Sequence, residues 1–239
     1  AYFRGARLQQ ANFEEANLET AVFQEADLRG ANFKKANLKQ AIFITADLTD
    51  ITESNEVIVT NFEEANLEKA DLSCAKLQRA NLQKVNLSKA NLKAADLEAA
   101  DLRHSNLSEA DLLDANLRVA FLREAIFYRA DLHRANLQVA YLYRANLQSA
   151  KLVGANLIKA DLQKANLKLA NFTSAYLQFA DLYRADLEGA NLKDADLESA
   201  NLEGANFYRA DIEGTNFKNA DLDIADFSQS KNFTEEQIQ

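Results

Sequence analysis

The stretch ANLEKADLSCAKLQRANL, residues 65–82, holds the pattern that decides the fold of this chain. A leucine recurs in it every five residues, and an alanine lies two positions before each one. We call such a large apolar residue a centre. Centres recur every five residues from Phe3 to Leu48 and from Phe62 to Phe227, which makes 44, and alanine precedes 40 of them by two positions. Asp or Asn directly precedes 34 centres, so the repeat reads A-[DN]-L-x-x.

A five-residue period fits neither of the straight regular structures. In an α-helix, five residues turn the chain by about 140° per unit, so the centres would surround the helix instead of forming a stripe. In a straight strand, an odd period points successive centres to opposite faces. The chain keeps every centre inside only if it turns after each unit. The pattern therefore predicts a solenoid with one short side per pentapeptide.

Departures from the repeat indicate four sides in each coil. Tyr2, Val22 and Ile42 replace the Asp or Asn at intervals of 20 residues, and Phe121 and Tyr141 are again 20 apart. Stacked coils of four pentapeptides produce such a superperiod. All six glycines lie two residues after a centre. We expect this position to form the corner, where a permissive backbone helps.

One segment interrupts the repeat. The centres Leu48 and Phe62 lie 14 positions apart instead of five, so ITESNEVIV, residues 51–59, is a nine-residue insertion at an expected corner. Corners tolerate insertions because they disturb stacking least. We expect a short excursion whose apolar end folds back on the rod. Two interpretations stay open, a structurally neutral scar or a partner-contacting loop. The candidate contact residues are Thr52, Glu53, Ser54, Asn55 and Glu56.

Composition and charge narrow the class of protein. Of 239 residues, 48% are hydrophobic and none is Pro, Trp or Met, which is typical of a folded domain. Residues 181–239 contain 14 acidic and 5 basic side chains, whereas residues 1–180 contain 22 of each. A neutral body with an acidic end argues against direct nucleic-acid binding. No apolar run approaches the length of a membrane span, so no membrane insertion is expected.

The two ends of the chain differ. After the last centre, residues 228–239 drop the repeat, and Thr234 with Gln237 has capping-box spacing. We predict a repeat domain at 1–229 and a C-terminal cap at 230–239, with a short helix from Thr234 to Gln239. The chain enters the repeat at once at Ala1. Either an upstream segment caps the first coil, or this coil pairs end to end with another molecule.

The second diagnostic stretch, KLVGANLIKADLQKANLKLANF at residues 151–172, completes the family signature. Together with residues 65–82 it resembles the pentapeptide-repeat family, with its cyanobacterial, plastid and other bacterial members. The resemblance implies an all-β fold, a right-handed quadrilateral β-helix of about 11 coils, with one corner insertion and the capping helix. It is specific for the fold and does not specify a function.

Apolar residues at outward positions form the candidate partner surface. On four-sided coils, Phe121, Tyr141, Tyr143 and Tyr183 share one side. Exposed aromatic rings interleaved with Arg have the composition of a protein-binding hot spot. The alternative is scattered rings that pack on neighbouring aliphatic stems. The candidate surface comprises Phe121, Tyr128, Tyr141, Tyr143, Tyr176, Tyr183, Arg123 and Arg144.

The sequence contains no arrangement that predicts catalysis. His104 and His133 lie in different coils, and neither has a second ligand at metal-binding spacing. Cys74 is the single cysteine, so no intramolecular disulfide is expected. No carboxylate pair, phosphate-binding glycine loop or nucleophile elbow stands out. We predict no enzyme, no cofactor and no metal site.

Three functional hypotheses remain. The leading one is a non-catalytic structural rod that presents side chains at fixed spacing to a protein partner. The family implies two others: a DNA-mimicking modulator of a type II topoisomerase, and a lumenal or periplasmic scaffold. The compartment stays open between the cytoplasm and, if an upstream signal was removed, the periplasm or thylakoid lumen.

Overall fold

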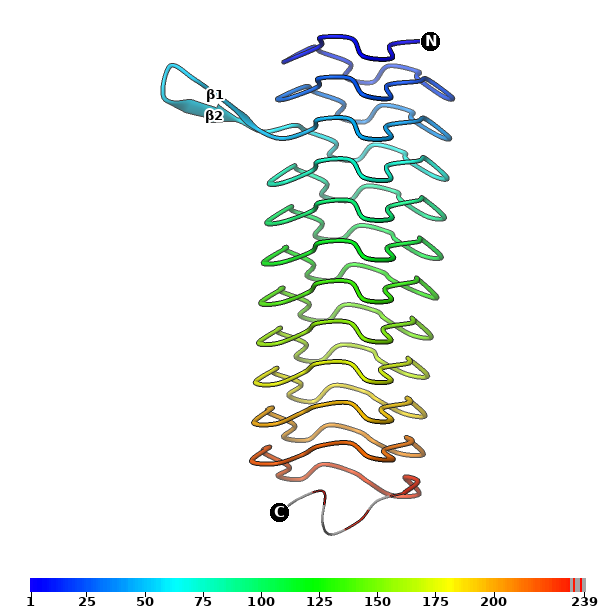
Figure 1. Cartoon of the computed structure of the whole chain (residues 1–239), viewed down its shortest axis with the longest axis vertical. Coiled ribbons are helices and arrows are strands. Elements are labelled where there is room, and N and C mark those ends of the chain that lie inside the picture. Colours follow the sequence, from blue (N-terminus) through cyan, green and yellow to red (C-terminus); the bar gives the residue numbers. More distant parts are fainter. Residues whose placement is uncertain (233, 235–236, 238–239) are drawn as a thin grey trace.

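The computed structural model of the chain describes residues 1–232, 234 and 237. It is a straight rod of stacked coils that begins at residue 1 and whose last repeats lie at the opposite end (Figure 1). Single parallel bridges join residues 20 apart in neighbouring coils, such as Tyr2 with Val22 and Phe121 with Tyr141. Four pentapeptides therefore make one coil, as the superperiod predicts. The described part of the chain contains no helix that could cross a lipid bilayer.

A pentapeptide with Asp or Asn before its centre satisfies its five backbone N–H groups in a characteristic way, which the unit 31–35 illustrates. The N–H of Asn32 donates to the preceding coil (2.9 Å), and those of Phe33 and Lys35 donate to the following coil (2.7 and 2.8 Å). The N–H of Ala31 closes the turn (2.9 Å). The N–H of Lys34 donates to the Oδ1 atom of Asn32 (3.1 Å). The coil thus leaves none of these donors to compete for water.

The last of these bonds explains why Asp or Asn precedes each centre. Only a short side chain with an acceptor oxygen reaches the N–H two residues further on. Asn also links neighbouring coils, because its Nδ2 donates to the residue one coil earlier, from Asn32 to Asn12 (3.2 Å) and from Asn81 to Asn61 (3.0 Å). Asn side chains therefore form hydrogen-bonded ladders along the rod.

The corner position has a left-handed backbone in nearly every unit. The six glycines have φ between +63° and +66°, which confirms the expected corner. Residues with side chains occupy most other corners with similar angles, including Ala99 (φ 57°) and Val139 (φ 59°). A turn hydrogen bond with one positive φ at the third residue matches a type II turn, which normally prefers Gly or Asn there.

Val139→Gly is expected to raise the free energy of unfolding by about 1 kcal/mol, because a β-branched residue is strained at this angle. Chemical denaturation of the variant against the unchanged chain measures the gain. Replacing Val139 by isoleucine is the control and should bring no gain. A loss of stability in the glycine variant would contradict the assignment of corner strain.

Centres and alanines together fill the interior of the rod. Most centres, such as Phe33 and Leu142, are fully buried, as are the alanines between them. The first coils contain two columns of stacked rings. Phe13, Phe33 and Phe62 stack with centroid separations of 5.0 and 4.8 Å, and the rings of the other column meet them edge to face. Alternate Phe and Leu centres therefore build continuous aromatic columns within a dense core.

The insertion forms the only hairpin in the described part of the chain. Strands β1 (Ile51–Glu53) and β2 (Glu56–Ile58) pair antiparallel, and Ser54 and Asn55 between them both have positive φ, as in a type I′ turn. The hairpin projects sideways from the rod (Figure 1). Across it, the spacing of bridged residues rises from 20 to 29, as in Asn32 with Asn61. The nine residues thus leave the coil stacking intact.

The base of the hairpin is fitted closely to the coil. A Cβ atom on Gly30 would lie 2.8 Å from Cγ2 of Ile51 and 3.2 Å from Cγ2 of Ile58, so only glycine leaves room for both. Thr60 lies at the exit, where its buried hydroxyl accepts from the Gly30 N–H (2.9 Å) and donates to the Thr49 carbonyl (3.0 Å). The expected return of the apolar end holds for Ile58, whereas Val57 is exposed.

At the other end, Gln237 covers part of the last coil. Its side-chain amide donates to the carbonyls of Ile212 (2.5 Å) and Thr215 (3.2 Å), and the backbone carbonyl of Gln237 accepts from the Phe217 N–H (3.2 Å). Its Oε1 accepts from the Thr234 N–H (2.7 Å), which is one of the two bonds of a capping box. The predicted helix from Thr234 to Gln239 falls largely outside the described residues.

Candidate functional site

One face of the rod brings together the insertion and most of the candidate surface. A row of parallel bridges passes the exit of the hairpin and runs along this face through Asn61, Asn81, Asp101, Phe121 and Tyr141. The hairpin leaves from one corner of the face, three coils before Phe121. At about 4.8 Å per coil the two are about 14 Å apart along the rod.

Phe121 and Tyr141 form an exposed aromatic ladder on this face. Their rings stack with centroids 5.3 Å apart and an interplanar angle of 7°. Each side chain is 44% exposed, although stacking already covers one face of each ring. With Arg103, Arg123, Tyr143 and Asp161 they line a shallow groove of about 400 Å³. The arrangement offers flat apolar surface to a ligand, with charged groups around it.

The fold does not require these two rings. They occupy positions where the repeat has Asp or Asn, whose oxygen would accept the N–H two residues further on. Among the described residues, no side chain accepts from the N–H of Arg123 or Tyr143, which follow the ladder. The chain therefore gives up two hydrogen bonds of its own repeat to expose apolar rings. Local violations of a fold's pattern are expected at functional sites.

Cations surround Tyr143, which lies beside the ladder. Arg123, Arg144 and Lys164 approach its ring to 5.4, 5.5 and 5.7 Å from the centroid. One coil beyond Lys164, Arg184 lies over the ring of Tyr183 at 5.0 Å. Cation–π contacts at exposed sites are worth about 0.5–1 kcal/mol each. They hold the charged groups beside the aromatic surface without neutralising them.

The structure unites only some of the predicted surface residues. Tyr183 lies on the ladder face but is separated from Tyr143 by Gln163, one coil in between. Tyr128 and Tyr176 do not lie on the ladder face. They lie on the two faces that flank it, which are on opposite sides of the rod. The guanidinium of Arg129 lies over the ring of Tyr128, 5.0 Å from its centroid. Phe121, Tyr141, Tyr143, Arg123 and Arg144 thus form the compact part of the candidate surface.

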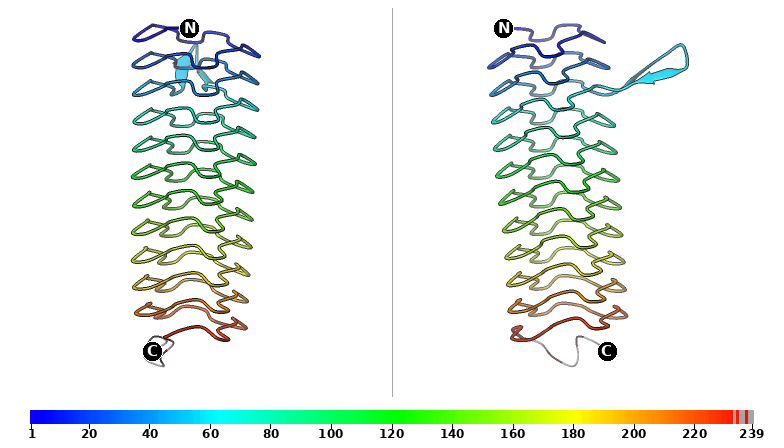
Figure 2. Two further views of the ribbon diagram at one scale, coloured as in Figure 1. Left: turned by 90° about the vertical axis from the view of Figure 1, so that its right-hand side faces the viewer. Right: turned by 180° about the vertical axis from the view of Figure 1, so that it is seen from behind.

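The sum of charges over residues 1–180 conceals a basic band. Residues 121–180 contain eight basic and three acidic side chains, whereas residues 1–120 contain 14 basic and 19 acidic. Because a solenoid stacks its sequence in order, these blocks become bands along the rod, the basic one in green and yellow (Figure 2). The sequence alone held this signal, and counting charges coil by coil would have found it.

Asp161 lies next to Tyr141 at the end of the ladder. Burial raises the pKa of this carboxyl above its usual value, and the neighbouring Asp181 adds to the effect. An aspartate at the same position of another unit shows the opposite shift, because a hydrogen bond from Arg29 lowers the pKa of Asp27. Asp161 is thus a partly buried carboxylate at the edge of the groove that the ladder lines.

Asp161→Asn is expected to stabilise the fold at neutral pH. A raised pKa in the folded state means that the folded chain binds more protons, so the unchanged protein loses stability as pH rises above about 4. The melting temperature of the variant should exceed that of the unchanged chain at pH 7 and approach it near pH 3. Asp27→Asn is the control of opposite sign. Equal effects of both substitutions would contradict the assignment.

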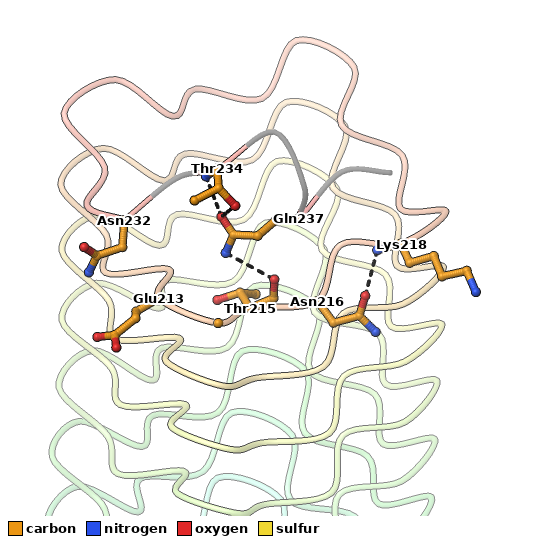
Figure 3. Close-up of a pocket in the computed structure, with 8 residues that line it drawn as sticks. Glu213, Thr215, Asn216, Lys218, Asn232, Thr234 and Gln237 are labelled. Atoms are coloured by element: carbon orange, nitrogen blue, oxygen red, sulfur yellow. Dashed lines mark hydrogen bonds between the residues drawn. The ribbon is translucent and has the colours of Figure 1, made fainter.

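A second, polar pocket lies at the C-terminal end, where Glu213, Thr215 and Asn232 surround Gln237 (Figure 3). Its donors and acceptors are largely engaged in covering the last coil, as described above, so it belongs to the end of the fold. Within the described residues, no three His, Cys, Asp or Glu side chains are grouped to hold a metal ion. His104 and His133 contact Glu124 (3.3 Å) and Asp131 (2.5 Å). Cys74 is exposed at a corner.

A four-sided β-solenoid with a pentapeptide period defines the class of protein. The chain belongs to the pentapeptide repeat family, whose pattern matches in eight copies over 1–40, 11–50, 60–98, 86–123, 95–138, 140–175, 150–189 and 190–229. Members fold as right-handed quadrilateral β-helices, so the predicted all-β quadrilateral β-helix is confirmed, whereas the number of coils and the capping helix stay predictions.

Several solved structures are similar to this chain. HetL, a pentapeptide repeat protein involved in heterocyst differentiation regulation in the cyanobacterium Nostoc, is 34% identical over 89% of this chain and 87% of its own, with a TM-score of 0.39. A protein of the Arabidopsis thaliana thylakoid lumen is 35% identical over 48% of this chain and 71% of its own, with a TM-score of 0.26. QnrB1, a plasmid-mediated fluoroquinolone resistance protein, is 17% identical over 94% and 91%, with a TM-score of 0.38. No curated protein sequence matches.

Proposed function

We propose that this protein is a non-catalytic interaction rod that binds a protein partner through the aromatic face, by which we mean the face of the rod that carries Phe121 and Tyr141. The observation that carries the proposal is the stacked pair Phe121 and Tyr141, 44% exposed at positions where the repeat itself calls for Asp or Asn. Exposed aromatic rings beside Arg are enriched at interface hot spots. The rod supplies rigidity, because its side chains are fixed at coil spacing and lose little freedom on binding.

Replacement by the residue of the repeat tests this function without harming the fold. The variant Phe121→Asn, Tyr141→Asn removes the ladder and offers the N–H groups of Arg123 and Tyr143 an acceptor, so its melting temperature should equal or exceed that of the unchanged rod. Tyr176→Asn makes the same exchange outside the ladder face and is the matched control. Capture from the native source should recover one protein with the unchanged rod and with the control, and lose it with the double variant. Undiminished capture by the double variant would refute the proposal.

The charge bands bear on the alternative of a DNA-mimicking topoisomerase modulator. A DNA mimic needs acidic surface along its length, and the basic band at 121–180 interrupts it. The acidic residues 181–239 are compatible with that role over only a part of the rod. A supercoiling assay with gyrase, with and without a quinolone, tests the alternative, and inhibition or protection by the rod would favour it over the interaction rod.

A further inference from the structure

The corner that follows the aromatic face carries a cationic ridge, which we define as Arg144, Lys164 and Arg184. The three residues lie 20 apart and so occupy the same corner in successive coils, where each backbone N–H continues the same row of inter-coil hydrogen bonds. At about 4.8 Å per coil, the ridge is about 10 Å long. The hairpin leaves from the opposite corner of the face, so ridge and hairpin border the aromatic face on its two sides.

Within the described part of the chain, the ridge stacks three cations that have no acidic partner at one corner, whereas other cations without such a partner, for example Arg129 and Lys159, lie singly at their corners. Cross-coil ion pairs are common elsewhere, as between Arg134 and Asp114 (2.6 Å) or Lys84 and Glu64 (3.1 Å). Among the described residues, no carboxylate lies within ion-pair distance of the ridge. Glu124, one coil before Arg144, is engaged by Arg123 (3.4 Å) and His104 (3.3 Å). Three charges thus remain available beside an apolar groove.

We propose that the aromatic ladder and the cationic ridge together bind a short acidic segment of a protein that carries an aromatic side chain. This inference rests on the proposed function and names the partner's chemistry. The aromatic side chain stacks on Phe121 and Tyr141, and carboxylates of the segment pair with the ridge. An extended chain rises about 3.3 Å per residue, so two acidic residues three positions apart span the 10 Å between Arg144 and Arg184.

The charge bands select a protein segment over a nucleic acid. Aromatic rings with cations also suit single-stranded nucleic acids. The basic band covers 60 residues, or three coils, which is about 14 Å of rod. On one side lie residues 1–120 with 19 acidic and 14 basic side chains, and on the other residues 181–239 with 14 acidic and 5 basic. A longer polyanion would run onto these acidic bands and be repelled, whereas a short acidic segment fits between them.

Fluorescence anisotropy with synthetic probes tests the inference. The main probe is a labelled decapeptide containing Glu-x-x-Glu next to Phe. Three labelled control probes are compared with it: the peptide with Gln in place of both Glu, the peptide with Ala in place of Phe, and an oligothymidylate. The unchanged rod should bind the first peptide at least about tenfold more tightly than each of the others. Raising the salt concentration should weaken this binding, because exposed ion pairs are screened.

Two charge variants locate the site on the rod. The ridge variant Arg144→Gln, Lys164→Gln, Arg184→Gln should weaken binding of the acidic peptide by at least about tenfold. The control Arg134→Gln, Lys151→Gln, Lys168→Gln removes three charges from the same band on other faces and should change binding by less than about threefold. Both variants change exposed side chains, and circular dichroism confirms that they fold.

The outcomes separate this inference from the function on which it rests. Equal binding of the Gln peptide, equal loss in both charge variants, or tighter binding of the oligothymidylate would overturn the inference. If the captured natural partner depends on Phe121 and Tyr141 but is retained by the ridge variant, the interaction rod stands and the acidic-segment inference is wrong. If capture depends on neither, both are wrong.

Discussion

Phe33→Ala is expected to lower the free energy of unfolding by about 3–5 kcal/mol, the largest loss that we anticipate for a single substitution in this chain. The ring of Phe33 is fully buried and stacks on Phe13 at 5.0 Å and on Phe62 at 4.8 Å. It also meets Phe23 and Phe43 edge to face at 5.7 and 5.8 Å. Alanine would leave a cavity in the middle of the aromatic columns.

The loss should be local, because each coil of a solenoid contacts only its neighbours. Hydrogen exchange of backbone amides should accelerate in the coils around Phe33 and remain slow beyond about residue 100, with urea denaturation giving the total loss. Phe127 is the matched control, since it is equally buried and stacks on no other ring among the described residues. Phe33→Leu should cost about 1 kcal/mol more than Phe127→Leu. Equal costs would show that ring stacking adds nothing to burial.

Thr60→Ala is expected to cost about 1–2 kcal/mol, because it removes the buried hydroxyl that ties the hairpin exit to the coil. The Gly30 N–H would lose one acceptor at 2.9 Å, and the Thr49 carbonyl one donor at 3.0 Å. Alanine is nevertheless the residue of the repeat at this position. The threonine is therefore a consequence of the insertion.

Deleting Ile51–Val59 should keep the rod folded and make the same substitution nearly harmless, at less than about 0.5 kcal/mol. Joining Asp50 to Thr60 restores the five-residue period, so the ordinary turn replaces the hydroxyl contacts. Urea denaturation of the four proteins forms a double-mutant cycle with an expected coupling of about 1 kcal/mol. Strict additivity would contradict the role assigned to Thr60. Loss of folding in the deletion alone would make β1 and β2 part of the structural core.

The regular part of this fold could be predicted from sequence because every unit repeats the same physical requirement. A buried centre, a small alanine and an acceptor oxygen recur every five residues, so errors in single units do not accumulate. The corners were harder to predict, since only six carry glycine and the others, such as Val139, adopt positive φ against their own preference. Stacking between coils imposes that angle, and no local signal reports it.

The irregular parts of the structure are the hairpin, the aromatic ladder and the ridge, and they depend on contacts that do not repeat along the chain. The hairpin was recognisable as an insertion, but its three-residue strands give too weak a pattern to predict pairing. The aromatic ladder was predictable because Phe121 and Tyr141 break the repeat 20 residues apart. The ridge was missed because Arg144, Lys164 and Arg184 resemble any other polar corner residues. They are distinguished by stacking at one corner with no carboxylate of the described residues within ion-pair distance of any of the three, which requires the three-dimensional structure.

The central claim is that the face with Phe121 and Tyr141 contacts a protein partner, and site-specific photo-crosslinking tests it most directly. A benzophenone amino acid is placed at Tyr143 beside the ladder or at Tyr176 outside the ladder face, and the protein is irradiated in cells of its native source. We predict a crosslink to one protein from position 143 and none from position 176. An equal crosslink from both positions, or one from position 176 alone, would contradict the account.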